Sequence, residues 1–392
     1  MAGSQYVKQS LLPDELGRGF PALLRYGPYL FISNSEGYRD PDTEKLDDNL
    51  VHKPIEQCHN AFRRIANRLE KAGCGHESII RILTFNSGQE WSLKRMATWP
   101  EHFGPTGTAQ AVAWGTHGKT VDFNAISAYG MALMPEVERR IVEKGPGEGR
   151  AARITQAGDF VYVYGVGGND NPFTKEEVSF TAEHALERQH SNNFEWLRYY
   201  IEKVPGTMDD WVRLDAGLRR NPADAPAYRD LTKQIFNGKI PFAHFEVPFG
   251  ELANRYIQLG GLAVSRGVDK EIHWSVADPN DAESVTAGGL VFVSALNGNR
   301  DAKTGELLPL LHADKQGQAK QALSCLEAAL TRAGTSMDRV LSLEAFTRDT
   351  YFQDEFVETA VATFGKDAPA IGSAGAEMED GVDIQVVAIA AA

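Results

Sequence analysis

Three short apolar runs, one domain length apart, constrain the fold of this chain more than any other feature of its sequence. The runs YLFIS, FVYVY and LVFVS end at Ser33, Tyr164 and Ser294, and the two intervals between these ends agree to within one position. Each run has the β-branched and aromatic residues that are typical of a buried strand. A fixed period of this length indicates a repeated domain.

Two glycines keep nearly constant distances from these runs. The first glycine, Gly73 or Gly334, follows its run at the same distance in both outer copies, and the second, Gly104 or Gly365, again follows the first at one distance. In the middle copy the corresponding intervals, to Gly206 and then to Gly238, are longer by only one or two positions. Agreement of several ordered intervals is hard to obtain by chance. We therefore interpret the chain as three diverged copies of one domain, at residues 1–143, 150–266 and 271–392, the middle copy being the most diverged.

Each copy predicts the same order of elements, ββαβαββ. A β-hairpin comes first, followed by a helix in which apolar residues recur every three or four positions, as at Phe62, Ile65 and Leu69. A strand (79–85 or 340–346), a second helix ending at Phe-Gly, and a closing hairpin with a strand at 121–126 or 384–389 complete the unit. This pattern is typical of an α+β domain with helices on one face of a sheet.

Charge and cysteine content exclude some classes of function. The chain has 40 basic and 53 acidic residues and a formal net charge of −13, which argues against a nucleic-acid partner. No apolar stretch approaches the ~20 residues that cross a bilayer, and no secretory signal pattern is visible. The three cysteines lack a disulfide framework, which fits a reducing compartment. We therefore expect a cytoplasmic protein without a membrane partner.

The third copy resembles the RidA/YjgF/YER057c/UK114 family over its whole length. The resemblance rests on GGLVFVSALNG at 288–298, ALTRAGTSMDRVLSLEAFTRD at 329–349 and VDIQVVAIAA at 382–391. The first copy is similar but looser. Members of that family are homotrimers with a central barrel of strands, outer helices and ligand pockets at the subunit interfaces. The resemblance therefore implies an intramolecular pseudo-trimer with three inter-repeat clefts, present as a monomer or as a homodimer of it.

The family hydrolyses enamine and imine intermediates with an arginine that clamps the substrate carboxylate and a carboxylate in the closing strand. When the closing strands are aligned, the arginine position is occupied by Thr108 (or Gly107) in the first copy, His244 in the second and Ile371 in the third. The position of the acid is occupied by Asn124, Gly260 and Val387. No copy keeps either residue, and another side chain cannot easily replace bidentate binding by arginine. The sequence thus departs from the pattern for classical 2-imino-acid deamination.

The segment FAHFEV at 242–247 supplies the candidate catalytic residues, His244 and Glu246. Residues two apart on a strand point to the same face. An imidazole beside a carboxylate can act as an acid/base pair, with the carboxylate orienting the ring or acting on water. The alternative is a purely structural His–Glu hydrogen bond.

Polar residues near the ends of the hairpin strands are candidates for substrate binding. They include Ser33 and Asn34 in the first copy and Tyr164 in the second, with Gln110 and Asn124 on the closing hairpin of the first copy. Two arginines that follow the middle strand, Arg219 and Arg348, could replace the missing anion anchor. Ordinary turn chemistry and solvent exposure are the alternatives for all of these residues.

Two further patterns do not support a site. His184, Glu187 and His190 are spaced three apart, but residues six apart on a helix point about 240° away from each other and cannot share a metal. The glycines at 165–168 are not followed by the helix of a dinucleotide-binding fingerprint. We therefore expect neither a metal nor a cofactor.

These observations favour a cofactor-free hydrolase that acts on a small polar metabolite with a C–N bond, as an enamine/imine deaminase or by amide hydrolysis, in one inter-repeat cleft. Two alternatives remain open. One is a non-catalytic module that binds a small molecule or a protein, and the other is a lyase or hydrolase acting on a cyclic, chorismate-like metabolite. Because fold does not fix function, the side chains that converge in each cleft decide between them.

Overall fold

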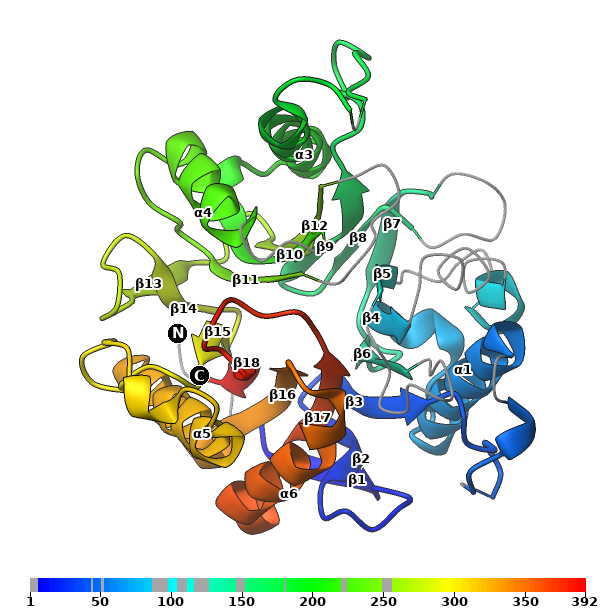
Figure 1. The fold of residues 1–392 in the computed structure, drawn as a ribbon. Helices are drawn as coiled ribbons and strands as arrows, with labels where there is room; N and C mark the ends of the chain where they lie inside the picture. The colour runs from blue at the N-terminus through cyan, green and yellow to red at the C-terminus, as the bar shows by residue number, and fades with distance from the viewer. Residues whose placement is uncertain are drawn as a thin grey trace.

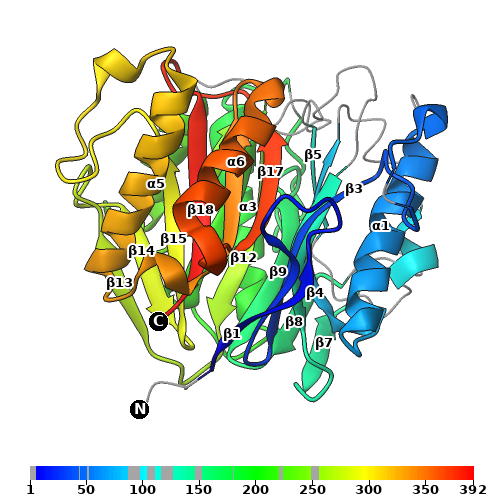
Figure 2. The same cartoon turned by 90° about the horizontal axis from the view of Figure 1, so that it is seen from below.

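The computed structural model describes residues 6–43, 45–50, 53–86, 98–103, 111–115, 127–145, 152–179, 181–219, 224–248 and 256–392. The described strands form three six-stranded mixed sheets. Figure 1 shows the sheets around a common centre with the helices on the outside, and Figure 2 shows the strand that begins at Lys8 and the C-terminus at the same end of the molecule. The chain therefore has a mixed α+β fold.

The three sheets have one strand order. The first runs β1 (Lys8–Pro13), β2 (Pro21–Tyr26), β3 (Tyr29–Glu36), β6 (Ser127–Leu133), β4 (Ile79–Asn86) and β5 (Ala111–Gly115). The second runs β7 (Arg139–Glu143), β8 (Ile154–Ala157), β9 (Phe160–Gly167), β12 (Ile257–Val264), β10 (Trp211–Leu218) and β11 (Ala243–Pro248). The third runs β13 (Lys270–Trp274), β14 (Ala282–Ala287), β15 (Leu290–Asn297), β18 (Ile384–Ala391), β16 (Val340–Thr347) and β17 (Ala370–Gly375).

The helices cover the outer face of each sheet. The long helices α1 (Pro54–Lys71), α3 (Ala185–Ile201) and α5 (Lys315–Arg332) follow β3, β9 and β15, and the shorter α4 (Asp224–Ile235) and α6 (Gln353–Phe364) connect the parallel pairs β10–β11 and β16–β17. Short 3₁₀ turns at His76–Ser78, Met208–Asp210 and Met337–Arg339 precede the middle strands. Further 3₁₀ turns occur at Asp48–Leu50, Pro309–Leu311, Thr350–Phe352 and Gly365–Asp367.

In the described part of the chain, each sheet has one strand more than the sequence pattern indicates. The order ββαβαββ misses the edge strands β1, β7 and β13, whose described ladders are with β2, β8 and β14. These edge strands are partly exposed and lack a clean alternation of buried and exposed residues, so hydrophobic periodicity does not reveal them. β7 belongs to the second sheet, although the sequence-based division at residue 143 places it in the first repeat.

The three sheets share one apolar core. It contains Phe31 of β3, Phe160 of β9 and Phe292 of β15, and the rings of Phe160 and Phe292 lie 5.5 Å apart, edge to face. Separate apolar clusters lie between each sheet and its own helices. Among the described residues no strand ladder joins one sheet to another, so the ladders there close no barrel.

An ionic network lies at the meeting point of the middle strands. It contains Arg81 of β4, Arg213 and Asp215 of β10 and Glu344 of β16, all at most 1% exposed. Arg213 Nη2 lies 2.8 Å from Glu344 Oε2 and its Nε lies 2.7 Å from Asp215 Oδ1. Arg81 binds Asp215 and lies 3.4 Å from Glu344 Oε1, and the Tyr129 hydroxyl donates to Glu344 at 3.2 Å. The four charges cancel, and their removal from water requires this mutual pairing.

Basic residues at the start of the edge strands connect the repeats in a cycle. Lys8 of β1 donates to the carbonyl of Asp338 at 3.2 Å, Lys270 of β13 donates to that of Trp211 at 2.9 Å, and Arg139 of β7 donates to that of Glu77. In each case the acceptor lies in or next to the 3₁₀ turn before a middle strand. The first repeat thus contacts the third, the second contacts the first and the third contacts the second.

Candidate functional site

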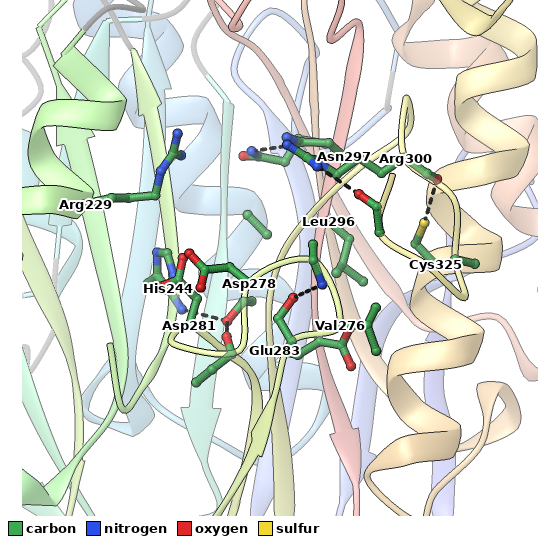
Figure 3. Close-up of a pocket in the computed structure, with 18 of the residues that line it drawn as sticks. Arg229, His244, Val276, Asp278, Asp281, Glu283, Leu296, Asn297, Arg300 and Cys325 are labelled. Atoms are coloured by element: carbon green, nitrogen blue, oxygen red, sulfur yellow. Dashed lines mark hydrogen bonds between the residues drawn. The ribbon is translucent and has the colours of Figure 1, made fainter. Parts of the chain in front are cut away.

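A cavity of about 310 Å³ lies between the second and third repeats. Strand β11 and helix α4 form one wall, and β14, β15, α5 and the loops around residues 275–281 and 300–305 form the other. In Figure 3, Arg229 and His244 come from one side of this cleft and Asn297, Arg300 and Cys325 from the other. The two repeats together therefore build the cleft.

His244 and Glu246 lie on the face of β11 that lines the cleft. Their strand neighbours Ala243 and Phe245 belong instead to apolar clusters shared between sheets, as the two-residue period of a strand requires. His244 Nδ1 lies 2.8 Å from Glu246 Oε2, and each residue is 7% exposed. The described residues provide no partner for the second ring nitrogen of His244, Nε2, which therefore remains available to a ligand.

Arg229 and Glu379 extend this pair. Arg229, on α4, binds Glu246 through Nη1 and lies 2.8 Å from Glu379 Oε1 through Nη2. Burial alone would raise the pKa of Glu246, but the charges of His244 and Arg229 outweigh it and lower the pKa to about 2. Glu246 is therefore a carboxylate at neutral pH, and its Oε2 accepts a hydrogen bond from the Nδ1–H of His244. This holds the neutral imidazole in the tautomer whose Nε2 carries a lone pair.

A serine of the third repeat fixes the main chain at His244. The His244 N–H donates to Ser294 Oγ at 3.1 Å, and this hydroxyl donates to the Ala282 carbonyl at 2.5 Å. The same contact recurs between the third and first repeats, where the Ile371 N–H donates to Ser33 Oγ at 2.9 Å. The two interfaces are thus equivalent in backbone but differ in the side chain presented, imidazole in one and isoleucine in the other.

The wall from the third repeat carries several charges. Arg332 and Glu283 form a bidentate pair with two contacts of 2.6 Å. The Cys325 Sγ faces the Arg300 carbonyl at 3.3 Å, and burial raises the pKa of this thiol to about 11. Cys325 is therefore a thiol rather than a thiolate nucleophile at neutral pH.

The predicted substrate-binding residues lie in different parts of the structure rather than in one site. Ser33 and Asn34 lie at the interface of the first and third repeats, where Asn34 Nδ2 donates to the Ser373 carbonyl at 3.1 Å. Arg348 Nε donates to the Val382 carbonyl at 3.0 Å, and Arg219 lies over the Tyr256 ring at 5.9 Å. None of these four residues lines the cleft beside His244. Gln110, Asn124 and the side chain of Tyr164 lie outside the described residues.

Strand register corrects the alignment of the first copy. Leu214 pairs with His244 and Leu343 with Ile371, and the equivalent residue of β4, Ile82, pairs with Ala111. Ala111, rather than Thr108 or Gly107, therefore occupies the position of His244. Likewise Tyr129, rather than Asn124, occupies the position of Gly260 and Val387. The segment VDFNAI at 121–126, which alternates as a strand would, lies outside the described residues, and the described strand that pairs with β4 is β6.

Sequence reasoning missed Arg229, Glu379, Asn297 and Arg300. Arg229 precedes Glu246 on a different element and Glu379 belongs to another repeat, and no local pattern connects either of them to Glu246. The last two had a detectable signal, because EGYRD at 36–40 and NGNRD at 297–301 occupy equivalent places in two copies. Of the two histidines spaced six apart, His184 precedes α3 and is exposed, whereas His190 lies on α3 and is buried with its ring against Thr232 Oγ1 at 3.0 Å.

Comparison with known proteins supports the assignment of the third repeat. Residues 279–392 match the family model described as Endoribonuclease L-PSP. The resemblance of the third repeat to the RidA/YjgF family is confirmed. Solved structures of that type include the YjgF gene product from E. coli (27% identity over 28% of this chain and 86% of that chain, TM-score 0.25). A member of the YjgF/YER057c/UK114 family from Mycobacterium tuberculosis is 22% identical over 32% of this chain and 100% of that chain, with a TM-score of 0.27.

A longer likeness extends beyond one RidA-type repeat. A chorismatase structure matches 80% of this chain and 93% of its own, with 15% identity and a TM-score of 0.50. At this identity the likeness concerns the fold alone. No curated protein sequence matches the chain. In the described part of the chain no helix has both the length and the apolar character needed to cross a membrane.

Proposed function

We propose that the cleft between the second and third repeats is the active site of a hydrolase for a small polar metabolite, with His244 as the acid/base. The observation that carries this proposal is the 2.8 Å contact between His244 Nδ1 and Glu246 Oε2, which leaves Nε2 available in the cavity. The ionised Glu246 orients the ring through its contact with Nδ1. Arg229 in turn holds Glu246.

Hydrolysis of an imine or enamine C–N bond suits this arrangement. Protonated His244 donates its Nε2 proton to the substrate nitrogen, or to the enamine carbon, and so makes the C=N carbon electrophilic. The neutral imidazole then takes a proton from the attacking water, and collapse of the carbinolamine releases a carbonyl compound and ammonia. The family resemblance of the third repeat supports this reaction class. In the sequence alignment, His244 falls at the strand position where the family carries its carboxylate-binding arginine.

A cyclic metabolite of the chorismate type is the second candidate substrate. It is favoured by the likeness to a chorismatase over 80% of this chain. The same acid/base pair could protonate a carbon–carbon double bond and activate water, so the residues proposed to act are the same for both candidates.

We also propose that the three repeats act as a pseudo-trimer in which only one interface is specialised for chemistry. The cyclic contacts of Lys8, Arg139 and Lys270 and the equivalent hydrogen bonds at Ser33 and Ser294 support this arrangement. In one chain each cleft can change independently, whereas in a homotrimer a single substitution changes all three.

Substitution of the pair tests the proposed function. His244→Ala and Glu246→Gln should each lower turnover by about 100-fold or more, with a melting temperature within a few degrees of the parent. Ser373→Ala is the matched control, because Ser373 lies two residues after Ile371 as Glu246 does after His244. Ammonia release from imines generated in situ by an amino-acid oxidase and loss of chorismate are the two assays. Full activity in both variants would refute the role of the pair, and binding of a substrate without turnover in the parent would indicate a binding module.

A further inference from the structure

The loop after the first long strand carries the same Arg-Asp pair in two repeats. Arg39 and Arg300 each lie six residues after the interface serine, Ser33 or Ser294. Each also forms an equivalent isolated bridge, Arg39 with Leu46 and Arg300 with Leu307. The two arginines therefore occupy equivalent places, and the chain itself provides the comparison between them.

In the first repeat the arginine is neutralised by a neighbouring acid. Arg39 Nε lies 2.6 Å from Glu36 Oε2, and Glu36 is 4% exposed. Burial would raise the pKa of Glu36, but the charges of Arg18, Arg39 and Arg64 outweigh it and lower the pKa to about 2. This site is therefore a closed ionic cluster.

In the third repeat the equivalent of Glu36 is the neutral Asn297. Arg300 donates Nη1 to the Gly305 carbonyl at 2.8 Å, and it forms no ion pair with any described carboxylate. The neighbouring Asp301 uses Oδ1 to accept the N–H groups of Lys303 and Thr304 at 2.9 and 2.8 Å. The other arginines of the cavity are paired, Arg229 with Glu246 and Glu379, and Arg332 with Glu283. Arg300 is thus the cavity arginine that is left for a ligand.

Two amides beside Arg300 have unused hydrogen-bonding capacity. Gln385 is 8% exposed and donates Nε2 to Asn297 Oδ1 at 2.9 Å, while its own Oε1 has no partner in the described structure. Asn297 consequently keeps its Nδ2 donor for another group. Both side chains line the same cavity. A buried polar atom without a partner costs free energy, and a bound ligand would recover it.

We propose that Arg300 and Asn297 bind a carboxylate of the substrate, and that Gln385 Oε1 accepts an N–H or O–H group next to it. The subsite lies on the wall facing His244, so a bound carboxylic acid would extend across the cleft toward the imidazole (Figure 3). This subsite rests on the proposed function, which places the reacting end of the substrate at His244. It assigns anion binding to Arg300 rather than to a residue of β11. Arg300 then determines specificity for acids over neutral analogues.

Fragment binding tests this subsite without requiring turnover. Pyruvate, benzoate and the neutral benzamide are titrated into the full chain by ligand-detected NMR, competing with one another. We expect at least one carboxylate to bind about tenfold or more tightly than benzamide, since bonds between charged partners are the stronger ones. Arg300→Gln should abolish this preference, Arg300→Lys should retain part of it, and Asn297→Glu, which copies the closed cluster of the first repeat, should abolish it with Arg300 in place.

Lys303→Gln is the matched control, because it removes one positive charge from the same loop at an exposed side chain outside the cavity. The preference should survive this change. The subsite is wrong if neither carboxylate binds preferentially to the parent, or if the preference persists in Asn297→Glu. If Arg300→Gln does not fold, Asn297→Glu decides alone. If carboxylate binding depends on Arg300 but turnover is unchanged in His244→Ala, the proposed function is wrong and the subsite stands. If turnover depends on His244 but carboxylate binding is unchanged in Arg300→Gln, the subsite is wrong and the proposed function stands.

Discussion

Removing the charge of Glu344 should destabilise the whole molecule rather than the third repeat alone. Glu344 is 1% exposed, and it contacts Arg213 at 2.8 Å, Arg81 at 3.4 Å and the Tyr129 hydroxyl at 3.2 Å. Glu344→Gln leaves two buried guanidinium groups facing Asp215 alone. Loss of one partner from a buried ion pair costs about 3–5 kcal/mol, so we expect a fall of that size in the free energy of unfolding. At a urea slope of about 3 kcal/mol/M this lowers the unfolding midpoint by about 1 M or more.

Tryptophan fluorescence reports whether this loss crosses repeats. Trp211 is fully buried in the second repeat, and five of the six tryptophans precede the third repeat, whereas Trp274 lies on its edge strand β13. Fluorescence and far-UV circular dichroism should therefore shift together when Glu344, in the third repeat, is changed. Glu358→Gln, on the exposed face of α6, is the control and should change the midpoint little. A loss below about 1 kcal/mol, or a fluorescence midpoint equal to that of the parent, would refute cooperation through the network.

Two further predictions concern stability. Burial lowers the pKa of His190 to about 3. Below about pH 6.5 the unfolded chain therefore takes up a proton at this residue and the folded chain does not. The free energy of unfolding should fall as the pH falls from 6.5 toward 3, and His190 should contribute roughly 2 kcal/mol of this loss at pH 5. Urea titrations at several pH values should show this slope, and a slope unchanged in His190→Gln would contradict it. Gly305 has φ +73°, and a Cβ there would lie 2.5 Å from Ala277 Cα, so Gly305→Ala should cost about 1–3 kcal/mol and loosen the cleft wall. An unchanged urea midpoint would show that the two loops are not in firm contact.

The repeat and the helix ends could be predicted from the sequence because backbone geometry fixes them. Gly73 and Gly334 follow α1 and α5 with φ of +74° and +75°, a conformation that glycine adopts without steric cost. Their spacing from the first long strand is therefore a structural length. In the second repeat, α3 ends at Ile201, and its C-cap residue Glu202 keeps a right-handed helical conformation. This different helix end accompanies the longer interval to Gly206.

The closing strand of the first repeat and most of the cleft could not be predicted in this way. Apolar and polar residues alternate at 121–126 at least as regularly as in Ser127–Leu133, the strand that pairs with β4. Periodicity alone therefore does not choose the register of the closing strand. The contact between Arg229 and Glu379 joins residues 150 positions apart across two repeats. Such contacts depend on how the sheets pack, which no local pattern records. The strand argument for His244 and Glu246 needed only residues on a single strand.

The contact between the first and third repeats imposes an order on biosynthesis. Ser33 accepts a hydrogen bond from Ile371, so the first repeat completes this surface only after β17 has been synthesised. The 338 positions that separate Ser33 from Ile371 take roughly 20–70 s to translate at about 5–20 residues per second. During that time the end of β3 has no partner from the third repeat. A nascent chain of this protein therefore carries an uncovered interface for most of its time on the ribosome, and a chaperone that shields it has a defined surface to bind.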